Sequence, residues 1–305
     1  MAAIAASLEP TRQQQVRRRP MKGRNSVERA SDQAGRAARQ VASQPWVEPL
    51  ARLGYSAKGV VYALVGILAA QAAFGTGGKT TDSQGALQTI LEQPFGQFLL
   101  GLVAIGLLGY VLWSLVQAVM DTENHGTDAK GIAQRLGYVG TAVVYAGLAL
   151  TAAQLALGSG GSGGGNASQD WTARLLAQPF GQWLVGTIGA LIIGFGFYEF
   201  YKAFTAKFRR QLKLNEMSER EKIWATRMGR FGLTARGIVF GVIGFFLIQA
   251  ARFSNASEVR GLGGALAALE SQPYVPWLLV LVALGLIAYG IYNFVLARYR
   301  QMAIG

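Results

Sequence analysis

The sequence predicts an all-α membrane protein: a polytopic six-helix transmembrane bundle built from three parallel two-helix repeats. Three observations support this prediction. The chain contains six apolar stretches of membrane-spanning length, an internal repeat that recurs three times, and basic residues concentrated in alternate connections. Of the 305 residues 51% are hydrophobic and 15% are charged, yet the net charge is +13. Basic and apolar residues must therefore be segregated along the chain.

Each apolar stretch can cross about 30 Å of hydrocarbon, which takes about 20 helical residues. None has the short alternating pattern of a membrane-barrel strand. We expect spans at Leu53 to Phe74, Phe95 to Val119, Leu136 to Leu157, Phe180 to Tyr201, Phe231 to Ala251 and Tyr274 to Leu296.

The repeat begins with an arginine and contains two spans. Ten residues after the arginine comes an aromatic residue, nineteen after it comes a glutamine, and Gln-Pro-aromatic precedes the second span. Two crossings return the chain to its starting side, so the three copies share one orientation and are expected to be pseudo-threefold. Closure into a ring and stacking in a row both stay open. The arginines are Arg52, Arg135 and Arg230, the aromatics Tyr62, Tyr145 and Phe240, and the glutamines Gln71, Gln154 and Gln249.

The expected organisation has five parts. They are a basic tail over 1–50, repeats over 51–122, 134–208 and 230–300, and a basic linker over 209–229.

The distribution of Lys and Arg outside the spans predicts the topology. One set of alternate connections, with both tails, holds 23 of these residues and the other set holds four. By the positive-inside rule both termini are cytoplasmic. This is the topology of a multi-pass protein of the bacterial inner membrane.

The N-terminal tail lacks the apolar core of a cleavable signal peptide and is expected to be disordered. Its Arg17, Arg18 and Arg19 are expected to contact anionic lipid headgroups. Nucleic acid is not an expected partner, because no aromatic residues are interleaved with these arginines. The Lys202 to Lys213 segment is expected to continue the fourth span as an amphipathic helix on the same headgroups.

The connections after the odd spans are rich in small residues. The run from Gly158 to Gly165 contains only glycine and serine and is typical of a flexible linker. Its spacing does not fit a phosphate-binding loop. A short apolar-periodic piece then precedes each even span, and we expect a short surface helix there, followed by a proline in the first turn of the span.

Three charged residues within the spans are candidate functional residues. Lys58 and Arg236 share the repeat position six residues after the arginine, and Glu199 lies near the end of the fourth span. At 1.5 Å per residue all three lie at one depth, near the cytoplasmic face. One interpretation is an ion pair of Glu199 with Arg236 or Lys58 beside a vestibule. The other is an ordinary structural pair with side chains that reach the headgroups.

The three repeat glutamines, Gln71, Gln154 and Gln249, are candidates for a ring of amides around the pseudo-axis. Helical geometry places Gln71 on the face opposite Tyr62, so both cannot face that axis. The alternative is three interfacial amides. Aromatic residues toward the ends of the even spans are expected to form an interfacial belt.

No enzyme site, cofactor or metal site is predicted. The chain has no cysteine and one histidine, His125. The polar turn around His125, with Asp121, Glu123 and Asp128, is expected to be solvated rather than to bind a divalent ion. The spans contain a single carboxylate, which leaves paired acid and base chemistry without support.

These residues resemble a bacterial membrane family known as domain of unknown function 1206, in which a two-helix unit occurs three times. The resemblance covers about Leu50 to Tyr299 and implies architecture and membrane residence, with no activity attached. Copy three departs from the pattern at Leu233 and at Val275-Pro276. The resemblance to the family rests on Arg52-Leu53-Gly54-Tyr55, on Arg135-Leu136-Gly137-Tyr138, on Gly232 with Gly237 and Phe240, and on the Gln-Pro-aromatic motifs that precede the even spans.

Two classes of function fit this sequence. The preferred one is a non-catalytic membrane scaffold or envelope-associated protein. The alternative is a small-solute or ion transporter with a polar path through Lys58, Arg236, Glu199 and the glutamines. Scaffolding is preferred because no span is interrupted by the glycine or proline breaks that transport sites commonly use.

Overall fold

Six long helices dominate the computed structural model, which describes residues 40, 44–76, 80–120, 129–159, 167–270 and 276–301. Each is long and apolar enough to cross a membrane, so the all-α fold and the six spans are confirmed. They are α2 (Val47–Ala73), α4 (Gly96–Met120), α5 (Ala129–Ala156), α7 (Gly181–Thr205), α8 (Glu219–Phe253) and α10 (Pro276–Tyr299).

Local sequence explains where several helices begin and end. α8 starts with a capping box, in which the Ser218 hydroxyl accepts from the Glu221 N–H and the Glu221 carboxylate accepts from the Ser218 N–H. α8 then runs for 35 residues and ends at Ser254, which has a left-handed conformation. The first turns of α8 therefore occupy the second half of the stretch expected to be a linker.

The Gln-Pro-Phe motif forms a turn, and the following helix begins two residues after the proline. Phe95 and Phe180 have φ of 61° and 63°, and α4 and α7 start at the next residue, a glycine. A Cβ on Gly96 or Gly181 would lie 2.2 Å from a carbonyl oxygen of the preceding helix, so only glycine fits. The expectation that the proline occupies the first helical turn is wrong for these two spans. The third motif, Gln272-Pro273-Tyr274, lies outside the described residues.

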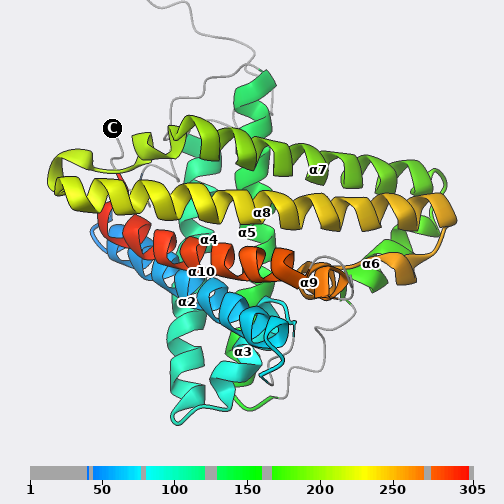
Figure 1. Ribbon diagram of the computed structural model, residues 1–305, viewed down its shortest axis with the longest axis horizontal. Helices are drawn as coiled ribbons and strands as arrows, with labels where there is room; N and C mark the ends of the chain where they lie inside the picture. Colours follow the sequence, from blue (N-terminus) through cyan, green and yellow to red (C-terminus); the bar gives the residue numbers. More distant parts are fainter. Residues whose placement is uncertain are drawn as a thin grey trace, which may run out of the picture.

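Three short helices precede the even spans, as the apolar-periodic pieces predict. They are α3 (Ser83–Leu91), α6 (Ala167–Leu176) and α9 (Leu262–Glu270). Figure 1 shows all three toward one end of the bundle, away from the C-terminus. We call this the cap end. Leu87 of α3 and Leu266 of α9 are fully buried, so these helices close the core at the cap end.

Successive repeats pack through the same pair of helices at all three junctions. The even helix of one repeat lies against the odd helix of the next, giving the pairs α4–α5, α7–α8 and α10–α2. The last pair joins repeat three back to repeat one, so the order is cyclic. Figure 1 shows α7 and α8 side by side, with α4 and α5 steeply inclined to them.

The cyclic arrangement is open on one side. Within repeats one and three the two long helices pack closely, because Gly54 lies against Tyr110 and Gly232 against Tyr289. In repeat two, Gly137 has no atom within 4 Å of an added Cβ, and Leu191 on α7 is 67% exposed. α5 and α7 are therefore separated along most of their length, and we call this gap the α5–α7 opening.

The segment after α7 is not the continuous amphipathic helix that the sequence predicted. α7 ends at Thr205, Ala206 has φ of 50°, and short 3₁₀ turns follow at Lys207–Gln211 and Leu214–Glu216. A left-handed residue cannot continue an α-helix. The apolar side chains of Phe208 and Leu212 are buried inside the protein, whereas Phe204 is exposed.

Candidate functional site: a charged aromatic hub

The three repeats meet at a cluster of charged and aromatic side chains, which we call the hub. It contains Lys58 and Arg236, which share one repeat position, and the buried carboxylate of Glu199. The aromatic residues come from all three repeats. They are Tyr62, Tyr110, Tyr145, Phe195, Phe240 and Tyr289.

Repeats one and three hold their buried cation in the same way. Lys58 Nζ donates to the Tyr110 hydroxyl at 3.0 Å, and Arg236 Nη1 donates to the Tyr289 hydroxyl at 2.8 Å. Both tyrosines lie sixteen residues after the motif proline of their own repeat. Repeat two has Thr141 at the cation position and Phe195 at the tyrosine position, so it lacks this contact.

A second contact joins each repeat to the next and recurs three times. The aromatic residue sixteen after the proline packs edge to face on the aromatic residue ten after the next repeat's arginine. The ring centroids are 4.8 Å apart for Tyr110–Tyr145, 5.1 Å for Phe195–Phe240 and 4.8 Å for Tyr289–Tyr62. The closing pair from repeat three to repeat one matches the other two, which is the cyclic relation expected of a pseudo-threefold axis.

The faces of these rings surround the two buried cations. Lys58 Nζ lies 4.6 Å, 5.1 Å and 5.4 Å from the ring centroids of Tyr110, Tyr145 and Tyr289, one from each repeat. Lys58 is only 5% exposed and, within the described ranges, has no carboxylate within 4.0 Å. The rings provide the attraction that a carboxylate would otherwise give, at about 0.5–2 kcal/mol for each close contact.

Arg236 has the same kind of environment, with a carboxylate in addition. Its Cζ lies 4.5 Å from the Tyr289 ring centroid and 5.1 Å from that of Phe240. Glu199 is 1% exposed, and its Oε1 accepts from Lys202 Nζ at 3.0 Å and lies 3.5 Å from Arg236 Nη1. The structure thus places Glu199 beside Arg236 and adds Lys202 to this cluster, which the sequence did not predict.

Glu199 occupies a repeat position that is polar and buried in every copy. The equivalent residues are Ser114 and Asn293, 1% and 0% exposed. Their side chains donate to the carbonyl four residues earlier, at 2.8 Å and 2.7 Å. Alignment of the three copies on their prolines would have revealed this position. Glu199 is the charged version, and its Oε2 has no hydrogen-bond partner among the residues that the structure describes.

The arginine that opens the repeat has a structural role outside the hub. Arg52 donates to the carbonyl oxygens of Ala297, at 2.6 Å, and Arg298 at the end of α10. Arg135 donates to the carbonyls of Ala118, at 2.6 Å, and Val119, at 2.9 Å, at the end of α4. Each arginine caps the last helix of the neighbouring repeat, where the helix dipole favours a cation.

Other predicted site residues do not join the hub. Gln71 and Gln154 are exposed and Gln249 is partly exposed, so these amides do not form a buried ring. The aromatic belt expected in the even spans is wrong for Tyr110, Trp113, Tyr289 and Tyr292, which are 2–7% exposed. The reason at the hub is that the two hydroxyls of Tyr110 and Tyr289 accept hydrogen bonds from buried cations.

Several sequence predictions fall outside the described residues. These are Arg17, Arg18 and Arg19 of the tail, the His125 turn with its acidic neighbours, and the glycine-rich run from residue 160 to 165. Within the described part of the chain, no group of three or more His, Asp or Glu residues could hold a metal ion.

The fold and the hub together define a class: a multi-pass membrane protein built from three two-helix repeats that meet around buried cations. The chain belongs to the family described as Domain of Unknown Function (DUF1206), whose model matches residues 53–121, 136–206 and 231–300. It is also 41% identical over 260 residues to the uncharacterized protein YxxB of Bacillus subtilis strain 168, covering 85% of this chain and 94% of the relative. No solved structure matches.

Proposed function

We propose that the protein is a non-catalytic scaffold of the bacterial inner membrane, with both termini in the cytoplasm. The observation that carries this proposal is the aromatic pair that recurs with one geometry at all three repeat junctions. These aromatic pairs hold each repeat to the next, and within repeats one and three a cation–tyrosine hydrogen bond holds the two long helices of the repeat together. A core built in this way is a rigid platform, and its exposed helices are available to partners.

Helix continuity also supports scaffolding over transport. The six long helices run without an internal break over their described residues. Transport sites are commonly built at broken helices, whose free backbone groups bind the solute. Close glycine contacts, such as Gly59 against Gly290 and Gly196 against Gly237, further lock neighbouring repeats together. The uneven distribution of Lys and Arg supports the cytoplasmic placement of the termini.

A second candidate function is transport, and the α5–α7 opening favours it. Phe195 is 40% exposed at this opening, and the side chain of Lys202 is 23% exposed. Gln134 of α5 donates to the hydroxyl of Tyr198 on α7 at 3.0 Å. A solute that entered here would meet Lys202 and then Glu199, the one buried carboxylate of the hub.

Reconstitution separates the two functions. We expect vesicles containing the full chain to show the same ion and proton flux as empty vesicles, for the wild type and for Glu199→Gln. Flux that exceeds the empty-vesicle rate and falls in Glu199→Gln would replace scaffolding with transport, because the substitution removes the buried charge at nearly constant shape.

A positive test of scaffolding uses photo-crosslinking in cell membranes. A crosslinking amino acid at Trp171, which is 65% exposed on the cap helix α6, is expected to give discrete protein adducts. The matched control is Phe197, which is 66% exposed on the long apolar helix α7 and is expected to meet lipid. Absence of adducts at Trp171, or equal adducts at both positions, would contradict a partner surface at the cap end.

A further inference from the structure

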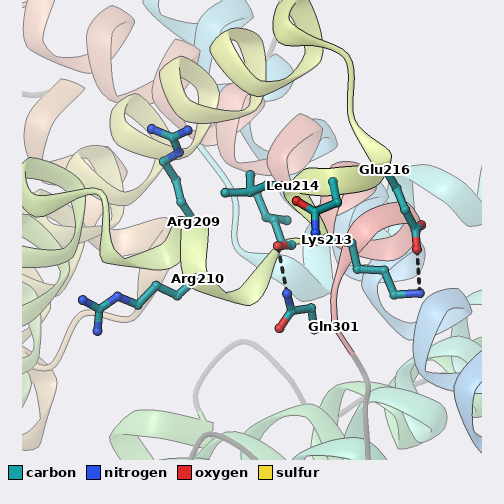
Figure 2. A pocket seen from close by; sticks show the side chains of 8 residues that line it. Arg209, Arg210, Lys213, Leu214, Glu216 and Gln301 are labelled. Carbon is teal, nitrogen blue, oxygen red and sulfur yellow. Dashed lines mark hydrogen bonds and ion pairs between the residues drawn. The ribbon is translucent and has the colours of Figure 1, made fainter.

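The α7–α8 linker, residues 206–218, is fastened to the end of the chain beside α10. The Lys213 N–H donates to the Tyr299 carbonyl at 2.7 Å, and the Gln301 N–H donates to the Gln211 carbonyl at 2.8 Å. The Gln301 side chain also donates to the Leu212 carbonyl at 3.2 Å, the bond drawn in Figure 2. This pairing gives the linker a defined path.

Packing beneath the linker fixes it further. Phe208 is 3% exposed and packs edge to face on Tyr292, with ring centroids 5.3 Å apart. A Cβ on Gly229 of α8 would lie 2.5 Å from the Phe208 ring, so the glycine is what allows this close contact. The basic residues next to Phe208 therefore start from an anchored backbone.

These anchored residues line a pocket of about 460 Å³. We call it the linker pocket. Its charged and polar lining comes from Arg209, Arg210, Lys213, Asn215, Glu216 and Gln301, and its apolar lining from Leu212 and Leu214.

The positive charge of the linker pocket is only partly neutralised. Glu216 pairs with Lys213 at 3.3 Å. Neither Arg209 nor Arg210 has a carboxylate within 4.0 Å in the part of the chain that the structure describes. Arg209 Nε is buried and, in the same part of the chain, has no hydrogen-bond partner. Two guanidinium groups of the lining thus carry positive charge that no carboxylate in this part of the chain neutralises, which suits the pocket to an anion.

The two arginines do not point to a single spot. Figure 2 shows their guanidinium groups on different sides of the linker backbone, with Lys213 turned toward Glu216. A ligand that contacts both guanidinium groups must therefore present oxygen atoms that lie apart, as the phosphate and glycerol oxygens of a phospholipid headgroup do. Exposed aromatic residues nearby in the chain, Phe204 and Trp224, are typical of the membrane interface.

We infer that the linker pocket binds the phosphate-bearing headgroup of an anionic phospholipid. Guanidinium groups bind phosphate through paired, charge-assisted hydrogen bonds. The leucines of the lining can contact the glycerol and the first methylenes of the lipid. This inference does not depend on scaffolding, since a transporter with the same linker would bind the lipid equally.

Native mass spectrometry of the full chain in detergent tests the inference. The probe is phosphatidylglycerol, compared with phosphatidylcholine and with inorganic phosphate as a competitor. Removing one arginine that contacts a headgroup phosphate is expected to lower lipid retention about fivefold. We therefore expect Arg209→Gln and Arg210→Gln each to lose about that much, and the double variant to lose more. The matched control is Arg227→Gln, which removes the same charge from an exposed position on α8.

The outcomes separate the possible explanations. Loss in the pocket variants, with retention in Arg227→Gln and thermal melting unchanged in all variants, supports the lipid site. Equal loss in Arg227→Gln would show that only overall charge matters and would overturn it. Displacement of the lipid by millimolar inorganic phosphate would overturn the lipid as the ligand of the linker pocket and assign the pocket to free phosphate. Equal retention of phosphatidylcholine would overturn the headgroup selectivity.

Discussion

At the scale of single residues, the arginine that opens a repeat can stabilise a helix of the neighbouring repeat. Arg52 and Arg135 mark the starts of their own repeats, yet their guanidinium groups cap helices of the repeat before them in the cyclic order. The equivalent Arg230 is exposed. The repeat arginine therefore caps a neighbouring helix in two copies and is exposed in the third. Arg230 can thus serve as a control for substitutions of Arg52 and Arg135.

Arg52→Ala is expected to destabilise the protein. The substitution leaves the Ala297 and Arg298 carbonyls without their donor, and hydrogen bonds to a charged group contribute about 1.5–3 kcal/mol. The measurement is the midpoint of thermal unfolding in detergent. Arg230→Ala removes the same charge from an exposed site and should leave the midpoint nearly unchanged. An equal decrease in both variants would mean that the cap adds nothing.

Part of the hub could be predicted from the sequence at this scale. The rise per residue of a helix converts residue number into depth in the membrane. The three charged residues have equal depth by this measure, so a pair of Glu199 with Arg236 could be predicted as one interpretation. The tyrosine cage around Lys58 could not be predicted. The contacts between Lys58 and tyrosines of the other repeats depend on the axial offset between neighbouring repeats. Residue spacing within one helix contains no information on that offset.

At the scale of helices, glycine determines which pairs come close. Gly244 of α8 would place a Cβ 2.6 Å from the Gly189 carbonyl oxygen of α7, and Gly189 would place one 2.9 Å from the Gly244 carbonyl oxygen. The two backbones approach through this reciprocal contact. Gly241, three residues away on the same helix, would place its Cβ in open space.

Gly244→Ala and Gly241→Ala should therefore differ sharply. The former inserts a side chain between α7 and α8, where overpacking costs about 1–3 kcal/mol. The latter gains helix propensity without a clash. Thermal unfolding of both variants in the same detergent provides the comparison. Similar stabilities for the two would contradict the close α7–α8 contact.

The helices themselves were well predicted, because long apolar runs and caps are properties of a local window. The prediction of a continuous helix beyond the end of α7 was wrong, and the reason is also local. Phe204, Phe208 and Leu212 have helical spacing, but Ala206 turns left-handed and redirects the last two into the core. Alanine is normally a good helix former, so nothing in its neighbourhood indicated that it would end this helix.

At the scale of the whole molecule, the repeats are related cyclically but are not equal. Repeat two lacks the cation and the tyrosine of the other copies, and its two helices are the ones that separate. The sequence predicted parallel repeats from the parity of their spans. It did not predict the α5–α7 opening, although Thr141 and Phe195 marked repeat two as the exceptional copy.

The proposed orientation can be tested by cysteine labelling, because the chain has no native cysteine. Ser257→Cys, at the cap end, should react with a membrane-impermeant maleimide on intact cells. Asn215→Cys, in the linker, should react only after lysis. Reaction of both in intact cells would refute the span count, and the reverse pattern would invert the orientation.

The contact between α10 and α2 has a consequence for how such a chain can arise. Since the last long helix pairs with the first as α4 pairs with α5, no repeat is structurally the first or the last. A gene rearranged to start at the second or third copy would encode the same set of neighbours. Which copy comes first along the chain is thus not fixed by the packing between copies.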